Sequence, residues 1–269
     1  MDPDLYPLTL LLSNISAQLR GALSNLHLAA AQLVPARERE KDPELDARAA
    51  RLDQSFYQLL RMVNTLSAST YLNSDDPLPL RDCDIVEEVS SLCEQAGPLA
   101  ELLGLRLRFV CSMERHICAI APDHLEQLVY HLLSNAFKFT PVGGTVTVEL
   151  QLRREQVLLS VADTGCGIPS ERMSTLFDQH LHMDELAPPP HGLGLGLALC
   201  HRIAEGHGGI LMAESREGVG SKFTVCIPDR TLGQELSDIP LDYSGGFNRT
   251  LMALADALPS KAFLIRQQD

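Results

Sequence analysis

His191-Gly192-Leu193-Gly194-Leu195-Gly196-Leu197-Ala198-Leu199 is a stretch in which three glycines at alternate positions lead into an apolar helical segment. Glycine leaves no side chain between a backbone N–H and an anion, and the first turn of a helix adds unpaired donors and the positive end of the helix dipole. The stretch therefore predicts a phosphate site. Glycine turns before helices also serve as simple caps, so this prediction depends on the motifs around it.

Composition narrows the classes of function. The 269 residues carry a net charge of −13 without a basic cluster, which argues against a nucleic-acid binder. Seven cysteines without a CxxC pair suit reduced thiols better than a zinc site or disulfides. No apolar run reaches the roughly 20 residues of a membrane span, and no export signal begins the chain, so we expect a cytoplasmic protein.

The first 72 residues show two heptad-like seams, in which apolar positions alternate at spacings of four and three. The seams are Leu8, Leu12, Ile15, Leu19, Ala22, Leu26, Ala29 and Leu33, then Leu45, Ala49, Leu52, Phe56, Leu59, Val63, Leu66 and Thr70. Between them, the charged residues 37–42 predict a solvated connector. This pattern predicts an antiparallel helical hairpin. One hairpin cannot cover its own seam, so we expect a homodimer through residues 5–72, as a four-helix bundle.

The polar, proline-containing residues 72–80 predict a domain boundary. Beyond it the pattern predicts helices at 84–103, 123–139 and 195–204 and strands at 105–110, 117–121, 145–152, 156–162, 210–215 and 221–227. The fold class is thus α+β: a helical hairpin, then an α/β sandwich with helices on one face of a sheet. We divide the chain into 1–74, 75–228 and a tail, 229–269, in which 249–258 is a short helix that packs on the core or docks a partner.

Two further polar clusters accompany the glycines. His131, Asn135 and Lys138 fall on one face of the helix at 123–139. An Asn oxygen suits Mg²⁺ and a Lys ammonium suits phosphate, although the stripe alone could simply be solvated. Asp163 follows a strand and precedes Gly165 and Gly167. Its carboxylate can accept a hydrogen bond from an exocyclic amine where glycines admit a flat ring, or else it only caps a turn.

Taken together, these motifs resemble the ATP-binding catalytic domain of sensor histidine kinases, in the GHKL superfamily. Residues 131–140 resemble the N box, 163–168 the G1 box, 176–177 a shortened F box, 192–196 the G2 box and 218–223 the final glycine turn. Residues 5–72 resemble the family's dimerisation and phosphotransfer hairpin.

The resemblance implies ATP and Mg as cofactors. Asp163 would bind the adenine amino group, Asn135 the Mg²⁺ and Lys138 the phosphates, with 178–191 as a mobile lid. The cofactor-binding residues implied are Asn135, Lys138, Asp163, Gly165, Gly167, Gly192, Leu193, Gly194, Leu195, Gly196 and Thr224.

The sequence departs from the family at the phosphoacceptor. The usual Ser-His-Glu-Leu-Arg-Thr-Pro-Leu is replaced by Ser16-Ala17-Gln18-Leu19-Arg20-Gly21-Ala22-Leu23. An alanine methyl cannot accept a phosphoryl group, so we expect no self-phosphorylation at Ala17 and regard no catalytic residue as secure. His27, about 15 Å further along the helix, is a poor substitute. His131 fills the place of the Glu that activates water in some relatives and is a weak candidate base, so little ATPase activity is expected.

Two functional hypotheses remain. The first is a dimeric histidine-kinase-like protein of two-component signalling that acts on or through a partner histidine kinase or response regulator. The alternative is a catalytically inactive nucleotide-binding scaffold, a pseudokinase that regulates other kinases by dimerisation. A serine kinase or ATPase of the wider superfamily is disfavoured by the hairpin and by the missing Glu. Fold alone does not separate the first two.

Overall fold

The computed structural model describes residues 5–69, 77–173, 176, 195–233 and 247–265. The chain forms two compact units. The helical unit comprises residues 1–75, 191–193 and 255–269, and the sheet unit comprises 76–190 and 194–254.

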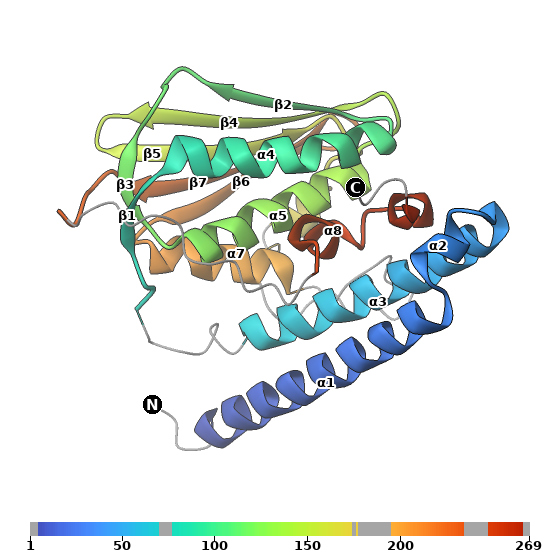
Figure 1. The fold of residues 1–269 in the computed structure, drawn as a ribbon. Coiled ribbons are helices and arrows are strands. Elements are labelled where there is room, and N and C mark those ends of the chain that lie inside the picture. The colour runs from blue at the N-terminus through green and yellow to red at the C-terminus, as the bar shows by residue number, and fades with distance from the viewer. Residues whose placement is uncertain (1–4, 70–76, 174–175, 177–194, 234–246, 266–269) are drawn as a thin grey trace. The chain divides into compact units, whose positions relative to one another are not determined.

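The helical unit is built on two long helices, as the seams predict. Helices α1 (Leu5–Leu33) and α3 (Pro43–Ser69) run side by side, with the short helix α2 (Ala36–Arg39) between them in sequence (Figure 1). The last part of the chain adds the 3-10 turn η2 (Ser260–Phe263), which packs against α3. Within the described ranges, no helix is long and apolar enough to cross a membrane.

The prediction of a solvated connector is wrong for Arg39. Its side chain is only 11% exposed and forms ion pairs with two carboxylates of α3, at 2.8 Å to Asp46 and 2.7 Å to Asp53. A run of charged residues in the sequence predicts exposure to solvent, because the partners that its side chains meet in the fold are not visible there. The partners of Arg39 lie seven and fourteen residues further along the chain. Arg39 is therefore part of the unit's interior.

The seam residues divide into a covered and an exposed group. Phe56 and Val63 are buried on α3, while Leu52 and Leu59 of the same seam are 54% and 47% exposed. Much of the α1 seam is also open, at Ile15, Leu19, Leu26 and Leu33. Some of α3's burial lies off the predicted seam, at Ala50, Asp53, Tyr57 and Leu60. The hairpin thus leaves a row of large apolar side chains on its surface.

The sheet unit is a mixed five-stranded sheet in the order β2-β4-β5-β7-β6, with helices on one face (Figure 1). Strand β2 runs parallel to β4, and the other neighbours are antiparallel. The strands are β2 (Arg106–Cys111), β4 (Thr145–Arg153), β5 (Gln156–Asp163), β6 (Ile210–Arg216) and β7 (Gly220–Pro228), and the longer helices are α4 (Ile85–Leu102), α5 (Pro122–Phe139) and α7 (Gly196–Gly206). This arrangement confirms the α+β class and the sandwich.

The core lies between the sheet and its helices. Along β4 the residues Val146, Val148 and Leu150 are almost fully buried, while the residues between them are partly exposed. This alternation is what a strand with one covered face requires. From α5, residues such as Leu128, Leu132 and Leu133 complete the core.

One strand pair was not expected from the sequence. Strand β1 (Arg81–Asp84) pairs antiparallel with β3 (Ile117–Ile120) in a separate two-stranded sheet. Asp84 ends β1 and caps α4 through the backbone N–H groups of Val86 and Glu87. The β1–β3 pair therefore fixes the start of α4. The four residues of β1 are largely polar, so the sequence pattern did not predict this strand. The remaining short helices are α6 (Ser170–Met173) and α8 (Arg249–Leu254).

Helix α8 belongs to the sheet unit. Its Thr250 hydroxyl lies 2.8 Å from the hydroxyl of Tyr130 on α5, and Arg249 pairs with Glu126 at 2.6 Å. Leu251 and Leu254 are buried. This part of the tail thus packs on the core, one of the two alternatives that the sequence leaves open.

His207 predicts a pH dependence of stability. Its Nε2 accepts the N–H of Ala121 at 3.0 Å, so Nδ1 carries the proton and donates to the Ile203 carbonyl at 2.7 Å. Burial is the main cause that lowers the pKa of His207, against the opposing hydrogen bond to Ile203. The unfolded chain, with a histidine pKa of about 6.5, then binds more protons than the folded chain below that pH.

We therefore expect the contribution of His207 to the free energy of unfolding to be constant above about pH 6.5 and to fall below it, by up to about 1.4 kcal/mol per pH unit for one proton. Urea unfolding at pH 7.5 and 5.5 measures the loss. Between pH 7.5 and 5.5 the free energy of unfolding should fall less in His207→Gln than in the wild type. A smaller fall remains in the variant, because burial also lowers the pKa of His124. Equal losses in both proteins would show that His207 does not titrate on unfolding.

Candidate functional site

Helix α5 presents a polar stripe on an otherwise buried surface. His131, Asn135 and Lys138 are each partly exposed, whereas their neighbours Leu132, Leu133, Ser134, Ala136 and Phe137 are buried. The spacing of four and three keeps the stripe on one face. The three side chains thus share one partly exposed face of the helix.

Asp163 stands at the end of β5, where backbone donors hold one of its oxygens. The N–H groups of Gly165 and Ser221 both donate to Oδ1, at 2.8 and 3.3 Å. Burial raises the pKa of Asp163, and the two backbone hydrogen bonds oppose this shift. Because both of these donors engage Oδ1, Oδ2 is the oxygen that can accept a hydrogen bond from a ligand amine.

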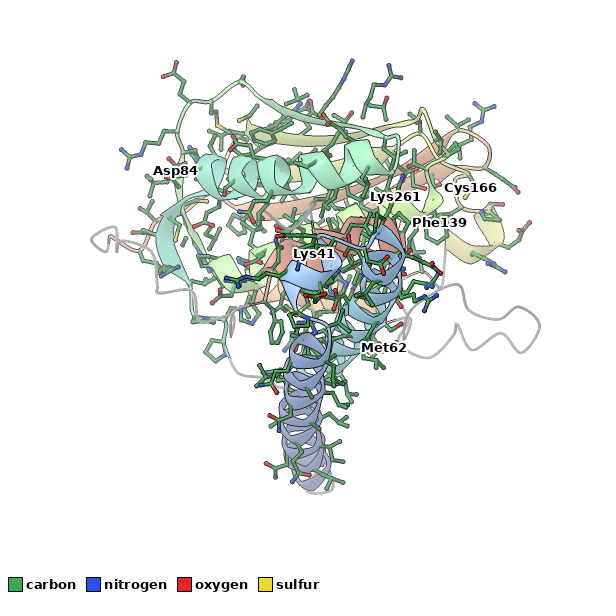
Figure 2. The ribbon with its side chains drawn as sticks, turned by 45° about the vertical axis from the view of Figure 1, so that its right-hand side comes forward. Lys41, Met62, Asp84, Phe139, Cys166 and Lys261 are labelled. Atoms are coloured by element: carbon green, nitrogen blue, oxygen red, sulfur yellow. The ribbon has the colours of Figure 1, made fainter. Side chains whose placement is uncertain are left out.

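Backbone contacts join the turn after Asp163 to two other elements. The N–H of Cys166 donates to the carbonyl of Phe139 at the end of α5, at 3.2 Å. The Cys166 carbonyl accepts the N–H of Gly218, at 2.7 Å, in the turn between β6 and β7. Phe139 and Cys166 accordingly lie close together in Figure 2. Three predicted motifs, distant in sequence, therefore form one continuous edge of the unit.

The glycines of this turn serve backbone packing. A β-carbon on Gly165 would collide with the Phe139 carbonyl, and one on Gly167, which has φ +68°, would collide with the Arg216 carbonyl. The sequence predicts that these glycines leave room for the flat ring of a ligand. The structure gives a different reason, because backbone atoms of the protein occupy the space where each side chain would be.

The end of the glycine-rich stretch lies against the polar stripe of α5. Gly196 begins α7, and a β-carbon there would lie 3.1 Å from Nδ1 of His131. Leu195, the N-cap residue of α7, makes no side-chain capping hydrogen bond. This geometry brings a helix N-terminus, with its backbone donors, next to His131 at one end of the polar stripe.

Several predicted residues fall outside the described part of the chain. They are Gly192, Leu193 and Gly194 of the glycine stretch, Phe177, and the lid candidate 178–191. Thr224 is described, but it lies on the face of β7 opposite Phe223 and pairs with Ser160 rather than with Asp163. The described contacts therefore link the Asp163 turn to the end of α5 and Gly196 to His131 on the same helix, whereas Thr224 lies apart from them; that Asn135, Lys138 and Leu195 belong to the same site stays a prediction.

Two residues were missed by the sequence interpretation. Ser221 donates its N–H to Asp163, and its hydroxyl lies 2.9 Å from that of Ser215. Phe139 is 50% exposed although it continues the apolar pattern of α5. Its backbone carbonyl contacts the Asp163 turn, and an exposed aromatic ring is suited to stack on a planar base. The place of Ser221 directly after the turn Gly218-Val219-Gly220 was the one sequence feature that pointed to its role. No such feature marked Phe139, because the apolar periodicity of α5 predicts that it is buried.

Comparison with known proteins identifies this arrangement. Residues 120–231 match the family described as "Histidine kinase-, DNA gyrase B-, and HSP90-like ATPase". The chain is 30% identical over 217 residues to the adaptive-response sensory kinase SasA of Synechococcus sp. (strain JA-2-3B'a(2-13)), covering 78% of this chain and 56% of that protein. The chain belongs to the histidine kinase family.

Other relatives agree with this assignment. The family member is 40% identical over 120 residues to the circadian input-output histidine kinase CikA of Synechococcus elongatus, which covers 44% of this chain and 16% of CikA. The crystal structure of full-length ShkA in complex with AMPPNP matches with a TM-score of 0.66 and 25% identity, over 82% of this chain and 46% of that one. This histidine kinase family member thus spans from about a sixth to little more than half of these relatives, and carries a histidine-kinase-like ATP-binding domain.

Proposed function

We propose that this protein binds Mg-ATP at the edge formed by α5, the Asp163 turn and α7, and acts in two-component signalling on or through a partner. The observation that carries the proposal is that a partly buried carboxylate, the polar stripe of α5 and the N-terminus of α7 belong to one unit, in which the Asp163 turn contacts the end of α5 and Gly196 lies against His131. We retain the division into 1–74, 75–228 and 229–269 as part of this proposal.

Each residue has a distinct role in the proposed site. Asp163 accepts the adenine amino group through Oδ2, and Phe139 stacks on the ring. The Asn135 amide oxygen ligates Mg²⁺, which prefers hard oxygen donors, and the Lys138 ammonium neutralises phosphate charge. The first turn of α7 donates backbone N–H groups to phosphate oxygens. When bound, Mg²⁺ would neutralise phosphate charge during phosphoryl transfer.

The residue at the phosphoacceptor position indicates that any phosphoryl transfer is to another protein. Ala17 is exposed on α1, at the position that matches the family's phosphoacceptor, and its methyl group cannot take a phosphoryl group. His27 is stacked on Phe56 at a centroid distance of 4.2 Å, and its Nδ1 lies 3.8 Å from Asp53. These contacts favour a packing role for His27. The phosphoryl group, if it is transferred, therefore goes to a histidine on another protein.

Labelled Mg-ATP tests this function. We expect no acid-labile label on this chain alone, and label on a candidate partner histidine kinase when the two are mixed, with transfer to a response regulator. Label on the partner only when this chain and ATP are both present would establish the enzyme. Nucleotide binding without label on any partner would favour the pseudokinase scaffold. Acid-labile label on this chain by itself would contradict the proposal for Ala17.

We also propose that a second copy of the chain covers the exposed apolar row of the hairpin. The row includes Leu26, which is 66% exposed, together with Leu19, Leu52 and Leu59. Burial of such side chains is favourable by about 1.5–3 kcal/mol each. An isologous pairing of hairpins would bury the same row on both copies.

Leu26→Glu is expected to weaken dimerisation at least tenfold, because it places a charge in the covered row. Sedimentation velocity over a concentration series measures the change. Leu152→Glu, on strand β4 and 41% exposed, is the matched control and should leave the association unchanged. An unaltered dimer in Leu26→Glu, or a monomeric wild type at all concentrations, would exclude this interface.

A further inference from the structure

The chain's last described residues are held by one stripe of the helical unit. The side-chain amide of Gln54 donates to the Leu258 carbonyl at 2.8 Å, and that of Gln58 donates to the Ala255 carbonyl at 3.4 Å. Arg61 pairs with Asp256 at 3.3 Å, and both side chains are about nine-tenths buried. The spacing of 54, 58 and 61 places the three on one face of α3.

Arg39 closes the far end of this stripe. Its guanidinium binds Asp46 and Asp53 through Nε and Nη1, and its Nη2 donates to the Phe263 carbonyl at 2.9 Å. Asp46 in turn accepts the N–H of Ile265 at 3.4 Å. The two carboxylates hold the planar fork in place, so one of its donors points at the tail backbone.

An aromatic anchor completes the contact. Phe263 is fully buried, and its ring centroid lies 5.4 Å from that of Tyr57 on α3. Leu258 and Ala262 are buried as well. The hairpin therefore recognises the segment in three ways: by its carbonyl oxygens, by one carboxylate and by one aromatic ring. A buried anchor surrounded by satisfied polar contacts is the usual composition of a peptide-binding site.

We propose that α2 and α3 form a peptide-binding face whose ligand is the chain's own C-terminal segment, residues 255–265. The segment occupies the stripe that runs from Arg39 and Asp46 to Arg61. It lies beyond residues 120–231, which match the ATPase family. The stripe is separate from the exposed row at Leu52 and Leu59, because the stripe's residues are buried or half-buried and contact the segment while that row remains open. The hairpin thus has one face filled in cis and another open.

Hydrogen exchange of the full-length chain tests the docking. In Arg39→Gln the amides of 260–265 should exchange at least tenfold faster than in the wild type, whereas those of α8 should not change. Arg48→Gln is the matched control, because the ion pair of Arg48 with Glu44 one turn away is exposed to solvent. Wild-type protection of the amides of 260–265 in Arg39→Gln would overturn the role of Arg39 in the proposal.

A variant in the ligand itself covers the case in which Arg39→Gln unfolds the hairpin. Phe263→Ala leaves every side chain of α2 and α3 intact and should also release 255–265, with α3 amides still protected. A labelled peptide of residues 255–269 should then bind full-length Phe263→Ala saturably and bind the wild type at least tenfold more weakly, since the wild-type face is filled. Equal binding to both proteins, or binding to neither, would overturn the proposal.

Discussion

Asp163→Asn is expected to weaken ATP binding by about 100-fold and to abolish the thermal shift that ATP gives the wild type. The Gly165 and Ser221 amides donate to Oδ1, so the Asn oxygen takes that place and its NH₂ group replaces Oδ2. An NH₂ group facing the adenine amino group sets two donors against each other. An unmet buried donor costs about 1–3 kcal/mol, and here both groups are left unmet.

Calorimetry with Mg-ATP and thermal unfolding with and without nucleotide measure this effect. Asp123→Asn is the matched control, because Asp123 lies at the first turn of α5 with its side chain 71% exposed. The control should bind ATP as the wild type does. A wild-type thermal shift in Asp163→Asn would mean that the adenine assignment is wrong, and no heat from wild-type protein would remove the proposed nucleotide site altogether.

The fold was largely predictable because most of its elements bury one face. The alternation along β4 and β5 and the apolar periodicity of α5 follow directly from the helices that cover the sheet. Strand β1 escaped prediction because Arg81-Asp82-Cys83-Asp84 has no apolar alternation and pairs only with β3, more than thirty residues on. A strand that depends on a distant partner leaves little local pattern.

Residue types at the site were predictable, but their partners were not. The carboxylate of Asp163 and the stripe on α5 could be read from spacing, whereas the donor role of Ser221 needs the turn between β6 and β7 to approach β5. Phe139 was obscured by periodicity, which places it with the buried residues of α5 although half of it is exposed. Arg39 shows the reverse case, since a charged run conceals a buried ion pair.

Gly220→Ala is expected to destabilise the sheet unit by at least about 3 kcal/mol and to disrupt ATP binding. Gly220 has φ +137°, where L-residues are strained by about 1–3 kcal/mol, and its β-carbon would collide with the Asp163 carbonyl. Relief of that overlap requires the Asp163 backbone to move, at a typical cost of about 1–3 kcal/mol for overpacking. The displacement would also carry the carboxylate away from its Oδ1 donors.

Gly218→Ala separates strain from collision. Gly218 sits two residues earlier in the same turn, with φ +75°, and a β-carbon added there would meet no atom within 4 Å. It should lose only about 1–2 kcal/mol, the usual cost of the left-handed conformation, and should bind ATP normally. Denaturant unfolding and calorimetry of both variants measure the difference. Equal losses in the two variants would mean that the turn does not press on Asp163, and that its glycines serve backbone conformation alone.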